Sequence, residues 1–217
     1  MSNERVTAPA TGRRGNLVIV AAPSGGGKSS LVNALLERDP GLVLSISHTT
    51  RQPRPGENDG DWYHFTDRES FLRLVDEGAF LEHATVFDNH YGTHAGEVER
   101  QLEQGLDVIL EIDWQGARQV RAARPETRSI FIVPPSLEVL RQRLSRRATD
   151  SDSTIERRMR DAQSEISHWH EFDFVVVNDD FDTALADLEA VFRSLRLAVA
   201  YQEKQHDSLL AELLANR

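Results

Sequence analysis

The chain contains no cysteine among its 217 residues. It therefore has neither disulfide bonds nor thiolate metal sites, and the reducing cytoplasm is the compartment that we expect for it. No apolar stretch approaches the roughly 20 residues of a membrane-spanning helix. Residues 1–15 also lack the apolar segment that a signal peptide needs. We expect this segment to be a disordered tail, and we expect no membrane partner.

Positive charge is in the minority. The chain has 25 Lys and Arg against 35 Asp and Glu, which gives a formal net charge of −10. Such a surface repels the phosphate backbone of nucleic acids, so a nucleic-acid partner is not expected. Hydrophobic residues make up 39% of the chain, enough for a substantial core. The length fits one domain with insertions.

The most informative stretch is glycine-rich and reads LVIVAAPSGGGKSS over residues 17–30. An apolar strand, a glycine-rich turn, Lys-Ser and a helical pattern follow one another, which is typical of a phosphate-binding loop. Glycines let several backbone N–H groups converge on a polyphosphate, and the following helix directs its positive end at the anion. A flexible linker is the alternative, but it would not need a buried strand before it and an amphipathic helix after it.

Two side chains of the loop have specific roles. Lys28 supplies a mobile positive charge for the β- and γ-phosphates, and the hydroxyl of Ser29 is a ligand for Mg²⁺. The loop departs from the usual pattern G-x-x-x-x-G-K-[ST] only at its first position, Ala22. The predicted nucleotide-binding residues of the loop are Ala22, Pro23, Ser24, Gly25, Gly26, Gly27, Lys28, Ser29 and Ser30.

Further apolar runs predict the rest of the core. They occupy residues 108–113, 129–133 and 174–177, and their continuity suits parallel strands that are buried on both faces. Helical patterns separate them, so we predict a three-layer α/β fold with a parallel central sheet. Asp113 stands at the carboxyl end of one run, where open α/β sheets bind their ligands.

Local signals predict several smaller features. Thr66 and Glu69 have the spacing of a capping box at the start of a helix, and Ser153 with Glu156 has the same spacing. Residues 89–93 contain Asn and Gly and are predicted to form a turn.

Two arginines lie on a proline-rich loop, residues 47–65. Arg51 and Arg54 can grip one phosphate group through bidentate hydrogen bonds. In isolation this spacing would more often be a solvated loop, but here it follows a phosphate-binding loop. We therefore interpret the pair as a phosphate clamp.

Carboxylates on apolar strands need partners. Glu82 and Asp113 could form structural ion pairs, or they could read a base. Guanine presents N1–H and N2–H₂ side by side, which a carboxylate can accept, whereas adenine lacks that edge. Hydroxyls such as those of Ser47 and Thr93 could donate to guanine O6.

Arginines are dense between residues 141 and 160. They could coat exposed helices, or they could neutralise a transferring phosphoryl group from a movable segment. Arg143 and Arg147 are four residues apart, as on one helix face. His90 and His94 have the same spacing but flank Gly92, so we do not expect a histidine metal site.

The motifs together resemble the guanylate kinases, most of all the bacterial enzymes. They occur in family order and cover about residues 16–205. The motifs are APSGGGKSSL at 22–31, SHTTRQPRPGENDGDWYHF at 47–65, FLEHATVFDNHYGT at 80–93, DVILEIDWQGA at 107–117 and VVNDDFDTAL at 176–185.

The resemblance implies a Mg²⁺-dependent transfer of the γ-phosphoryl group from ATP to GMP, and also to dGMP, in purine nucleotide metabolism. It implies a P-loop kinase core, a small mixed α/β insertion that binds GMP, and a helical lid. The corresponding segments are 16–46, 98–139 and 161–217 for the core, 47–97 for GMP binding and 140–160 for the lid.

The resemblance also implies residue roles. The GMP phosphate ligands would be Arg51, Arg54, Tyr63 and Tyr91, and the guanine readers Ser47, Glu82, Thr93 and Asp113. The catalytic cations would be Lys28, Arg51, Arg143, Arg147 and Arg158, and Asn178 would contact the adenine. The family lid often reads R-G-R-G, whereas residues 145–148 here are SRRA and lack both glycines.

Two other functions fit parts of the pattern. A non-catalytic guanylate-kinase-like module would bind protein partners, but such modules typically lack a working phosphate loop. A related kinase for a phosphorylated ribose or another nucleoside monophosphate would not need the guanine readers. The leucines near the C-terminus could pack on the core or on a second subunit, so a homo-oligomer stays open. They are Leu209, Leu210, Leu213 and Leu214.

Overall fold

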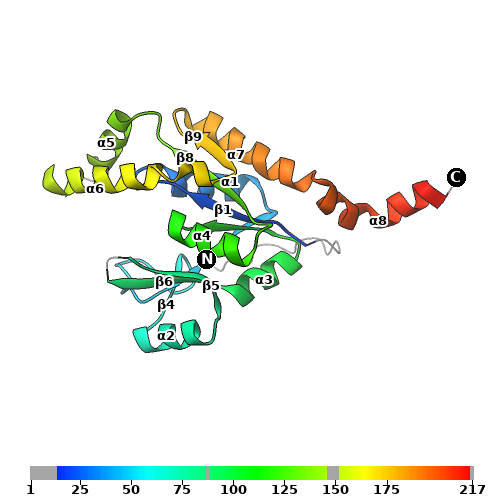
Figure 1. Ribbon diagram of the computed structural model, residues 1–217, viewed down its shortest axis with the longest axis horizontal. Coiled ribbons are helices and arrows are strands. Elements are labelled where there is room, and N and C mark those ends of the chain that lie inside the picture. Colours follow the sequence, from blue (N-terminus) through cyan, green and yellow to red (C-terminus); the bar gives the residue numbers. More distant parts are fainter. Residues whose placement is uncertain (1–13, 87, 146–151, 216–217) are drawn as a thin grey trace.

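The computed structural model describes residues 14–86, 88–145 and 152–215 (Figure 1). Its central sheet has five parallel strands in the order β2-β7-β1-β8-β9. The strands are β2 (Leu42–Leu44), β7 (Asp107–Glu111), β1 (Leu17–Ala21), β8 (Arg128–Val133) and β9 (Phe174–Val177).

Helices cover both faces of this sheet. Val18 and Val20 of β1 pack with buried residues of α1 (Lys28–Arg38) and α7 (Phe181–Arg196). Ile19, between them, packs on the other face with buried residues of α3 (Ala95–Glu103) and α4 (Trp114–Ala123). Successive strand residues point to opposite faces, so a continuous apolar run fills two cores. The predicted α/β fold with a parallel central sheet is confirmed.

A second, smaller sheet has the order β4-β3-β6-β5 and mixed strand directions. Figure 1 shows it beneath the parallel sheet, with α2 (Arg68–Asp76) on its outer side. The ring of Phe71 on α2 stacks on that of Phe80 with their centroids 4.7 Å apart. The strands are β3 (Ser47–Thr49), β4 (Tyr63–Phe65), β5 (Phe80–Val86) and β6 (Asn89–His94).

Two local predictions in this region are wrong. Residues 89–93 lie in strand β6 and not in a turn. A Cβ on Gly92 would come within 3.0 Å of the Phe80 ring, so this glycine makes room for packed rings and does not mark a turn. The backbone instead reverses at Asp88, whose φ is 65°.

The predicted cap of α2 is also displaced by one residue. Asp67, not Thr66, caps the helix by accepting a hydrogen bond from the Ser70 N–H. The Thr66 N–H donates to the Thr49 carbonyl and so belongs to the sheet. Because Asp is as good a cap as Thr, the spacing alone did not separate the two.

Helices α5 (Leu137–Ser145) and α6 (Asp152–Ile166) form a pair at one end of the sheet (Figure 1). Leu140, Leu144, Met159 and Ala162 make a small core between them. Helix α6 starts at Asp152, one residue before the predicted cap Ser153. Residue 147 lies outside the described residues. A 3₁₀ turn, η1 (Trp169–Glu171), follows α6 and leads into β9.

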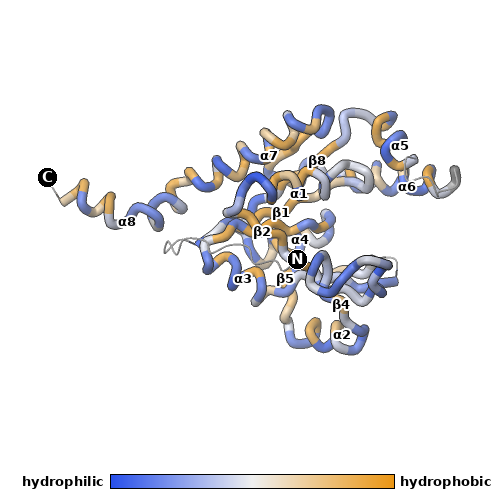
Figure 2. Tube along the Cα trace, turned by 180° about the vertical axis from the view of Figure 1, so that it is seen from behind, coloured by the Kyte–Doolittle hydropathy of each residue, from blue (hydrophilic) through white to orange (hydrophobic). Residues whose placement is uncertain are grey.

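The two ends of the described chain differ. Arg14, in the predicted tail, forms an ion pair with Glu99, and the Gly15 N–H donates to the Leu102 carbonyl. Residues 1–13 lie outside the described residues. Helix α8 (Val199–Ala215) extends away from the core, and Figure 2 shows hydrophobic residues along it. Among the described residues, no helix combines the length and the apolar character that crossing a membrane requires.

Candidate functional site

The glycine-rich loop joins the buried strand β1 to helix α1. Gly25 and Gly27 have φ values of +83° and +91°, a conformation that side chains with a Cβ rarely adopt. The Gly26 N–H donates to the Pro23 carbonyl at 2.8 Å, which tightens the turn. Lys28 is the first residue of α1, so its side chain leaves from the positive end of the helix.

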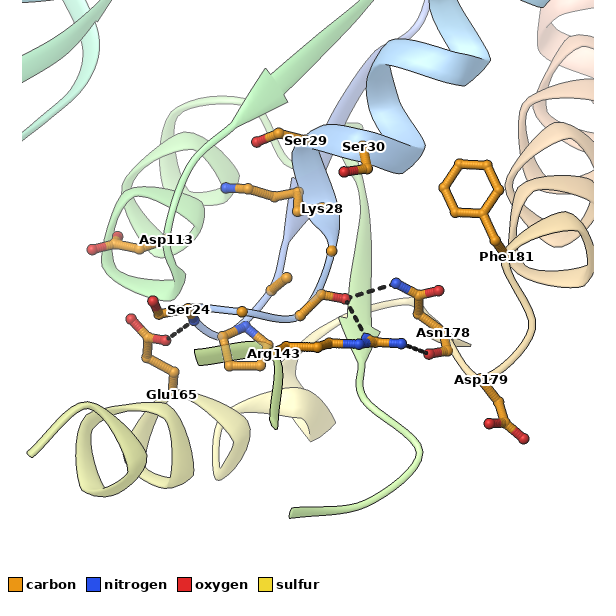
Figure 3. Close-up of a pocket in the computed structure, with 15 residues that line it drawn as sticks. Ser24, Lys28, Ser29, Ser30, Asp113, Arg143, Glu165, Asn178, Asp179 and Phe181 are labelled. Atoms are coloured by element: carbon orange, nitrogen blue, oxygen red, sulfur yellow. Dashed lines mark hydrogen bonds between the residues drawn. The ribbon is translucent and has the colours of Figure 1, made fainter. Parts of the chain in front are cut away.

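A cavity of about 620 Å³ opens above this loop (Figure 3). Every loop residue predicted to bind nucleotide, from Ala22 to Ser30, lines it. Asp113, Arg143 and Asn178, which come from later segments of the chain, line it as well. The structure thus brings predicted residues from both halves of the chain to one place.

Asn178 and Arg143 brace the loop. The Asn178 side chain is only 5% exposed, and its amide donates to the Gly26 carbonyl at 2.9 Å. Arg143 donates to the Asn178 carbonyl at 2.9 Å, and its other terminal nitrogen lies 3.5 Å from the Gly26 carbonyl oxygen. These bonds fix the Gly26 carbonyl and so hold the loop in place.

Phe181 and Asp179 also line the cavity, beside Asn178 (Figure 3). Neither residue was among the predicted site residues. Phe181 is 40% exposed although it is a large aromatic residue, so its ring offers a flat apolar face near the loop.

Glu111 is another residue that the sequence analysis missed. It ends β7, and the Ser29 hydroxyl donates to its Oε2 at 3.4 Å. Its Oε1 is buried and has no hydrogen-bond partner in the described part of the chain. A hard cation takes oxygen ligands of this kind, so the pair fits the Mg²⁺ that was predicted at Ser29.

Three of the four predicted guanine readers come together where the smaller sheet meets the start of α4. Glu82 is 5% exposed, and the Thr93 hydroxyl donates to its Oε1 at 2.6 Å. Asp113 caps α4 by accepting from the Gly116 N–H at 2.8 Å. A Cβ on Gly116 would lie 2.8 Å from the other oxygen of Glu82, so Gly116 sits directly between the two carboxylates.

The protonation of Glu82 depends on this environment. Burial raises the pKa of its carboxyl group to about 7, and the negative charge of Asp113 acts in the same direction. The hydrogen bond from Thr93 opposes this rise. Ser47, the fourth predicted reader, starts β3. The register of β3 against β6 pairs His48 with Gly92, which places Ser47 next to Thr93.

The predicted phosphate ligands lie nearby on the same sheet. The guanidinium of Arg51 lies 5.2 Å from the centre of the Tyr63 ring, and the Tyr63 and Tyr91 rings are 5.9 Å apart. Burial raises the pKa of the Tyr63 hydroxyl, which therefore stays a donor. Arg54 is exposed on the loop between β3 and β4.

Glu57, which was not predicted, contacts both arginines of this loop. Its carboxylate pairs with the Arg51 guanidinium at 2.9 Å and accepts from the Arg54 N–H at 2.8 Å. Glu57 therefore occupies a side of Arg51 that a phosphate group could also use.

Arg158 and Glu165 both belong to helix α6. Arg158 was predicted, whereas Glu165 was not. The Glu165 carboxylate lines the cavity and accepts a hydrogen bond from the Ser24 N–H at 2.9 Å (Figure 3). Of the predicted lid arginines, Arg147 lies outside the described residues.

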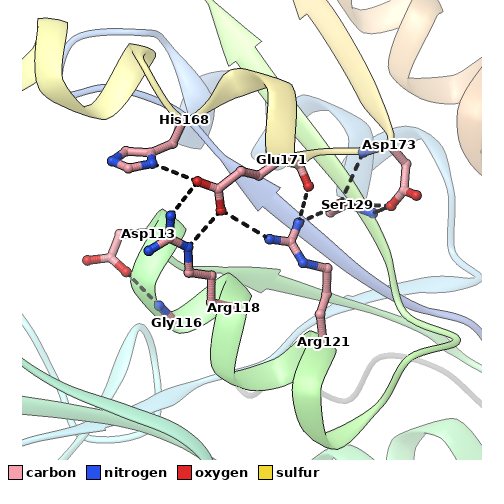
Figure 4. Close-up of polar contacts among 8 residues, drawn as sticks. All are labelled: Asp113, Gly116, Arg118, Arg121, Ser129, His168, Glu171 and Asp173. Atoms are coloured by element: carbon pink, nitrogen blue, oxygen red, sulfur yellow. Dashed lines mark hydrogen bonds and ion pairs between the residues drawn. The ribbon is translucent and has the colours of Figure 1, made fainter.

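A polar cluster ties the end of this helix pair to α4 (Figure 4). Glu171 accepts two hydrogen bonds from Arg118, at 2.6 and 2.8 Å, and contacts Nδ1 of His168 at 2.7 Å. The Trp114 and His168 rings stack 3.7 Å apart. Chiefly through the Arg118 hydrogen bonds, the pKa of Glu171 falls to about 2, so this carboxylate stays ionised.

The parallel sheet and the loop at its carboxyl edge define a nucleotide-binding protein of the P-loop class. Comparisons with known proteins narrow this class. The protein-family model for guanylate kinases matches residues 14–195. A guanylate kinase of Alkalilimnicola ehrlichii is 58% identical over 200 residues, which are 92% of this chain and 97% of the relative. One from Vibrio cholerae is 53% identical over 204 residues, 93% of this chain and 99% of the relative.

A solved structure agrees with these relatives. The crystal structure of a guanylate kinase from Anaplasma phagocytophilum matches with a TM-score of 0.72 and 36% identity, covering 87% of this chain and 90% of that one. The chain therefore belongs to the guanylate kinase family.

Proposed function

We propose that this protein transfers the γ-phosphoryl group of ATP to GMP, and also to dGMP, in a reaction that depends on Mg²⁺ and gives ADP and GDP. One observation carries the proposal. Asp113 lines the cavity of the phosphate loop, and its charge also acts on Glu82. A phosphate-binding site thus adjoins two carboxylates, the buried Glu82 and the half-buried Asp113, that can read a base.

Guanine recognition follows from the carboxylates. An ionised Glu82 accepts hydrogen bonds from the guanine N–H edge, and Asp113 offers a second acceptor close by. Thr93 fixes the orientation of Glu82 through their 2.6 Å hydrogen bond. Adenine has no matching N–H edge and would leave the buried carboxylate without donors, which disfavours AMP.

The phosphate of GMP is assigned to the arginine loop. Arg51 has five N–H donors, so it can keep one contact with Glu57 and turn another edge to the phosphate. The Tyr63 and Tyr91 hydroxyls add neutral donors, and Arg54 adds a second positive charge. We accordingly assign residues 47–97 to GMP binding and residues 140–160 to a lid.

On the donor side, the N–H groups of residues 24–30 and the ammonium group of Lys28 hold the ATP phosphates. We assign Asn178 and Phe181, which line the cavity beside the loop, to the adenine. Ser29 and Glu111 would hold Mg²⁺, which neutralises phosphate charge when it is bound. In the transfer, a GMP phosphate oxygen bonds to the γ-phosphorus while the bond to the bridging oxygen of ADP breaks.

The chain's own groups act by position and charge. Lys28 faces the donor phosphates, and Arg51 holds the acceptor phosphate in line. Arg143 and Arg158 lie on the helix pair beside the cavity and add positive charge as it closes, with Arg147 in the same segment. Closure also excludes water, which would otherwise consume ATP by hydrolysis. We place the reaction in the cytoplasm.

The test offers GMP, dGMP, AMP, CMP, UMP and a phosphorylated ribose separately and measures ADP formed from ATP and Mg²⁺. We expect turnover with GMP and dGMP and little with the others. Turnover with a sugar phosphate and not with GMP would contradict the base-reading assignment. ATP binding without turnover of any acceptor would contradict the kinase assignment and favour a binding module.

A further inference from the structure

One carboxylate in the phosphate site has no part in the function proposed above. Glu165 reaches from α6 to the loop and accepts a hydrogen bond from the Ser24 N–H at 2.9 Å (Figure 3). Positive-φ glycines, N–H groups and Lys28 make this loop a site for anions. An anion of the protein itself is therefore bound at the edge of the site that receives ATP.

The surroundings of Glu165 act on its charge in both directions. Burial raises its pKa, while the Ser24 N–H and the positive charge of Lys28 lower it. Asp113, at the start of α4, and Asp161, an exposed residue of α6, add negative charge that acts against its ionised form. The ionised carboxylate is thus favoured by the same two groups of the loop that attract a phosphate, and it is opposed by burial and by these two aspartates.

The incoming nucleotide changes this balance. The phosphates of ATP draw Lys28 to themselves and bring several negative charges into the cavity that Glu165 lines. An ionised Glu165 that stayed at Ser24 would then repel them. The carboxylate has to withdraw for ATP to bind at full strength.

The helix that carries Glu165 is packed into a defined body. Its residues Met159 and Ala162 share a core with α5, so the two helices form one packed pair. Beyond Glu165, the chain is fixed to α4 through Glu171 and Arg118 (Figure 4). The Glu165–Ser24 hydrogen bond is therefore the contact of α6 with the loop, next to a fixed anchor, while Arg143 of α5 reaches the Gly26 carbonyl at 3.5 Å.

We propose that Glu165 is a built-in counter-anion of the phosphate loop, which ATP displaces from Ser24 as it binds and which thereby couples nucleotide binding to release of α6. Glu165 is a positioning residue because it acts through the loop and the helix. Arg158 precedes it by seven residues, two helical turns, and so lies on the same face of α6. The proposal rests on ATP being the nucleotide of the proposed function.

The test is calorimetric binding of ATP and of ADP without any acceptor. Glu165→Gln keeps an oxygen that can accept from Ser24 but removes the charge. We expect it to bind both nucleotides about three- to tenfold more tightly than the wild type. The KM for ATP should fall by the same factor, whereas the KM for GMP should stay unchanged. A merely structural contact would not produce this split.

Asp161→Asn is the matched control, since it removes an exposed carboxylate four residues earlier on the same helix. Its ATP affinity should stay within about twofold of the wild type. Glu165→Ala is a second variant that removes the acceptor as well, and it should also bind ATP more tightly. With two variants, a folding defect in one leaves the test intact.

Equal or weaker ATP binding in both Glu165 variants would overturn the proposal. The binding assay contains no acceptor, so its result is separate from the identity of that acceptor. Tighter ATP binding without GMP turnover would support the counter-anion and contradict the proposed function. GMP turnover with unchanged ATP affinity in the Glu165 variants would support the proposed function and contradict the counter-anion.

Discussion

The phosphate loop is one continuous stretch of chain, whereas the region assigned to GMP is assembled from separate strands and one helix start. The loop is suited to hold a phosphate through backbone N–H groups, and residues 22–30 supply nine of the fifteen residues that line its cavity. The acceptor region uses side chains instead, from β3, β4, β5 and β6 and from Asp113 before α4. Backbone groups recognise any polyphosphate, while side chains can tell one base from another.

This difference predicts how substitutions separate the two regions. A change at the loop should affect every acceptor alike. A change among the guanine readers should alter the choice of acceptor and leave ATP binding intact.

The largest effect is expected from Lys28→Ala. It removes the one loop ammonium group that faces the transferring phosphoryl group, so kcat should fall by about 10³-fold or more with every acceptor. Steady-state ADP production measures the loss, and circular dichroism should show an unchanged fold. Normal turnover would remove Lys28 from the mechanism.

Gly116→Ala should act on the acceptor side alone. The new Cβ would lie 2.8 Å from Glu82 Oε2 and displace that carboxylate, so the KM for GMP should rise about tenfold while the KM for ATP stays constant. Glu82→Asp shortens the side chain and makes room. In the Glu82→Asp variant, Gly116→Ala should therefore raise the KM for GMP by a smaller factor than in the wild type. An equal factor in both proteins would show that Gly116 and Glu82 do not interact.

The raised pKa of Glu82 predicts a pH dependence. The carboxylate must be ionised to accept from guanine, and its pKa is about 7. The KM for GMP should therefore rise as the pH falls, by about tenfold between pH 8 and pH 6 from the ionised fraction of a single group. The KM for GMP of Glu82→Gln, measured over the same pH range, is the reference. The phosphate of GMP titrates in both experiments, whereas the variant lacks the titrating carboxyl group.

The Glu82 carboxyl group also makes the free energy of unfolding depend on pH. The folded-state pKa of Glu82 lies above its ordinary value of 4.5, so the folded state binds the proton more strongly than the unfolded state. Its contribution to stability is present below about pH 4.5 and is lost as the pH rises through 7. Denaturant unfolding at several pH values should show a shallower pH dependence in Glu82→Gln, and an identical slope would contradict the assigned pKa.

The smallest effect is expected from Glu57→Gln. The carboxylate orients Arg51 at 2.9 Å, and its loss should raise the KM for GMP about two- to fivefold. Asp61→Asn is the matched control on the same loop, since Asp61 bonds Asn58 and not an arginine. An equal change in both variants would point to the net charge of the loop and not to Arg51.

The same comparison explains what the sequence could predict. The loop and the strands β1, β7, β8 and β9 could be predicted because each is contiguous, with a recognisable order of residue types. Strand β6 was predicted as a turn, since the packing of the Phe71 and Phe80 rings against Gly92 is a tertiary fact. Local patterns carry no information about which rings meet across two strands.

The missed residues of the site share one property. Glu165 meets Ser24 across 141 residues of chain, and Glu111 meets Ser29 across 82. Glu165 belongs to none of the motifs, so its relation to the loop became visible only in the fold. A carboxylate on or at the end of an apolar strand is itself unusual, which made Glu82 and Asp113 predictable. Glu111 carries the same signal on the run 108–113, but its contact with Ser29 is visible only in the fold.

The most direct measurement is the ratio of kcat/KM for GMP to that for AMP in the wild type and in Glu82→Gln. An amide presents a donor where guanine also donates, so we predict that the substitution lowers this ratio by about tenfold or more. The KM for ATP should stay the same in both proteins. An unchanged ratio in a folded variant would contradict the account that Glu82 reads the base.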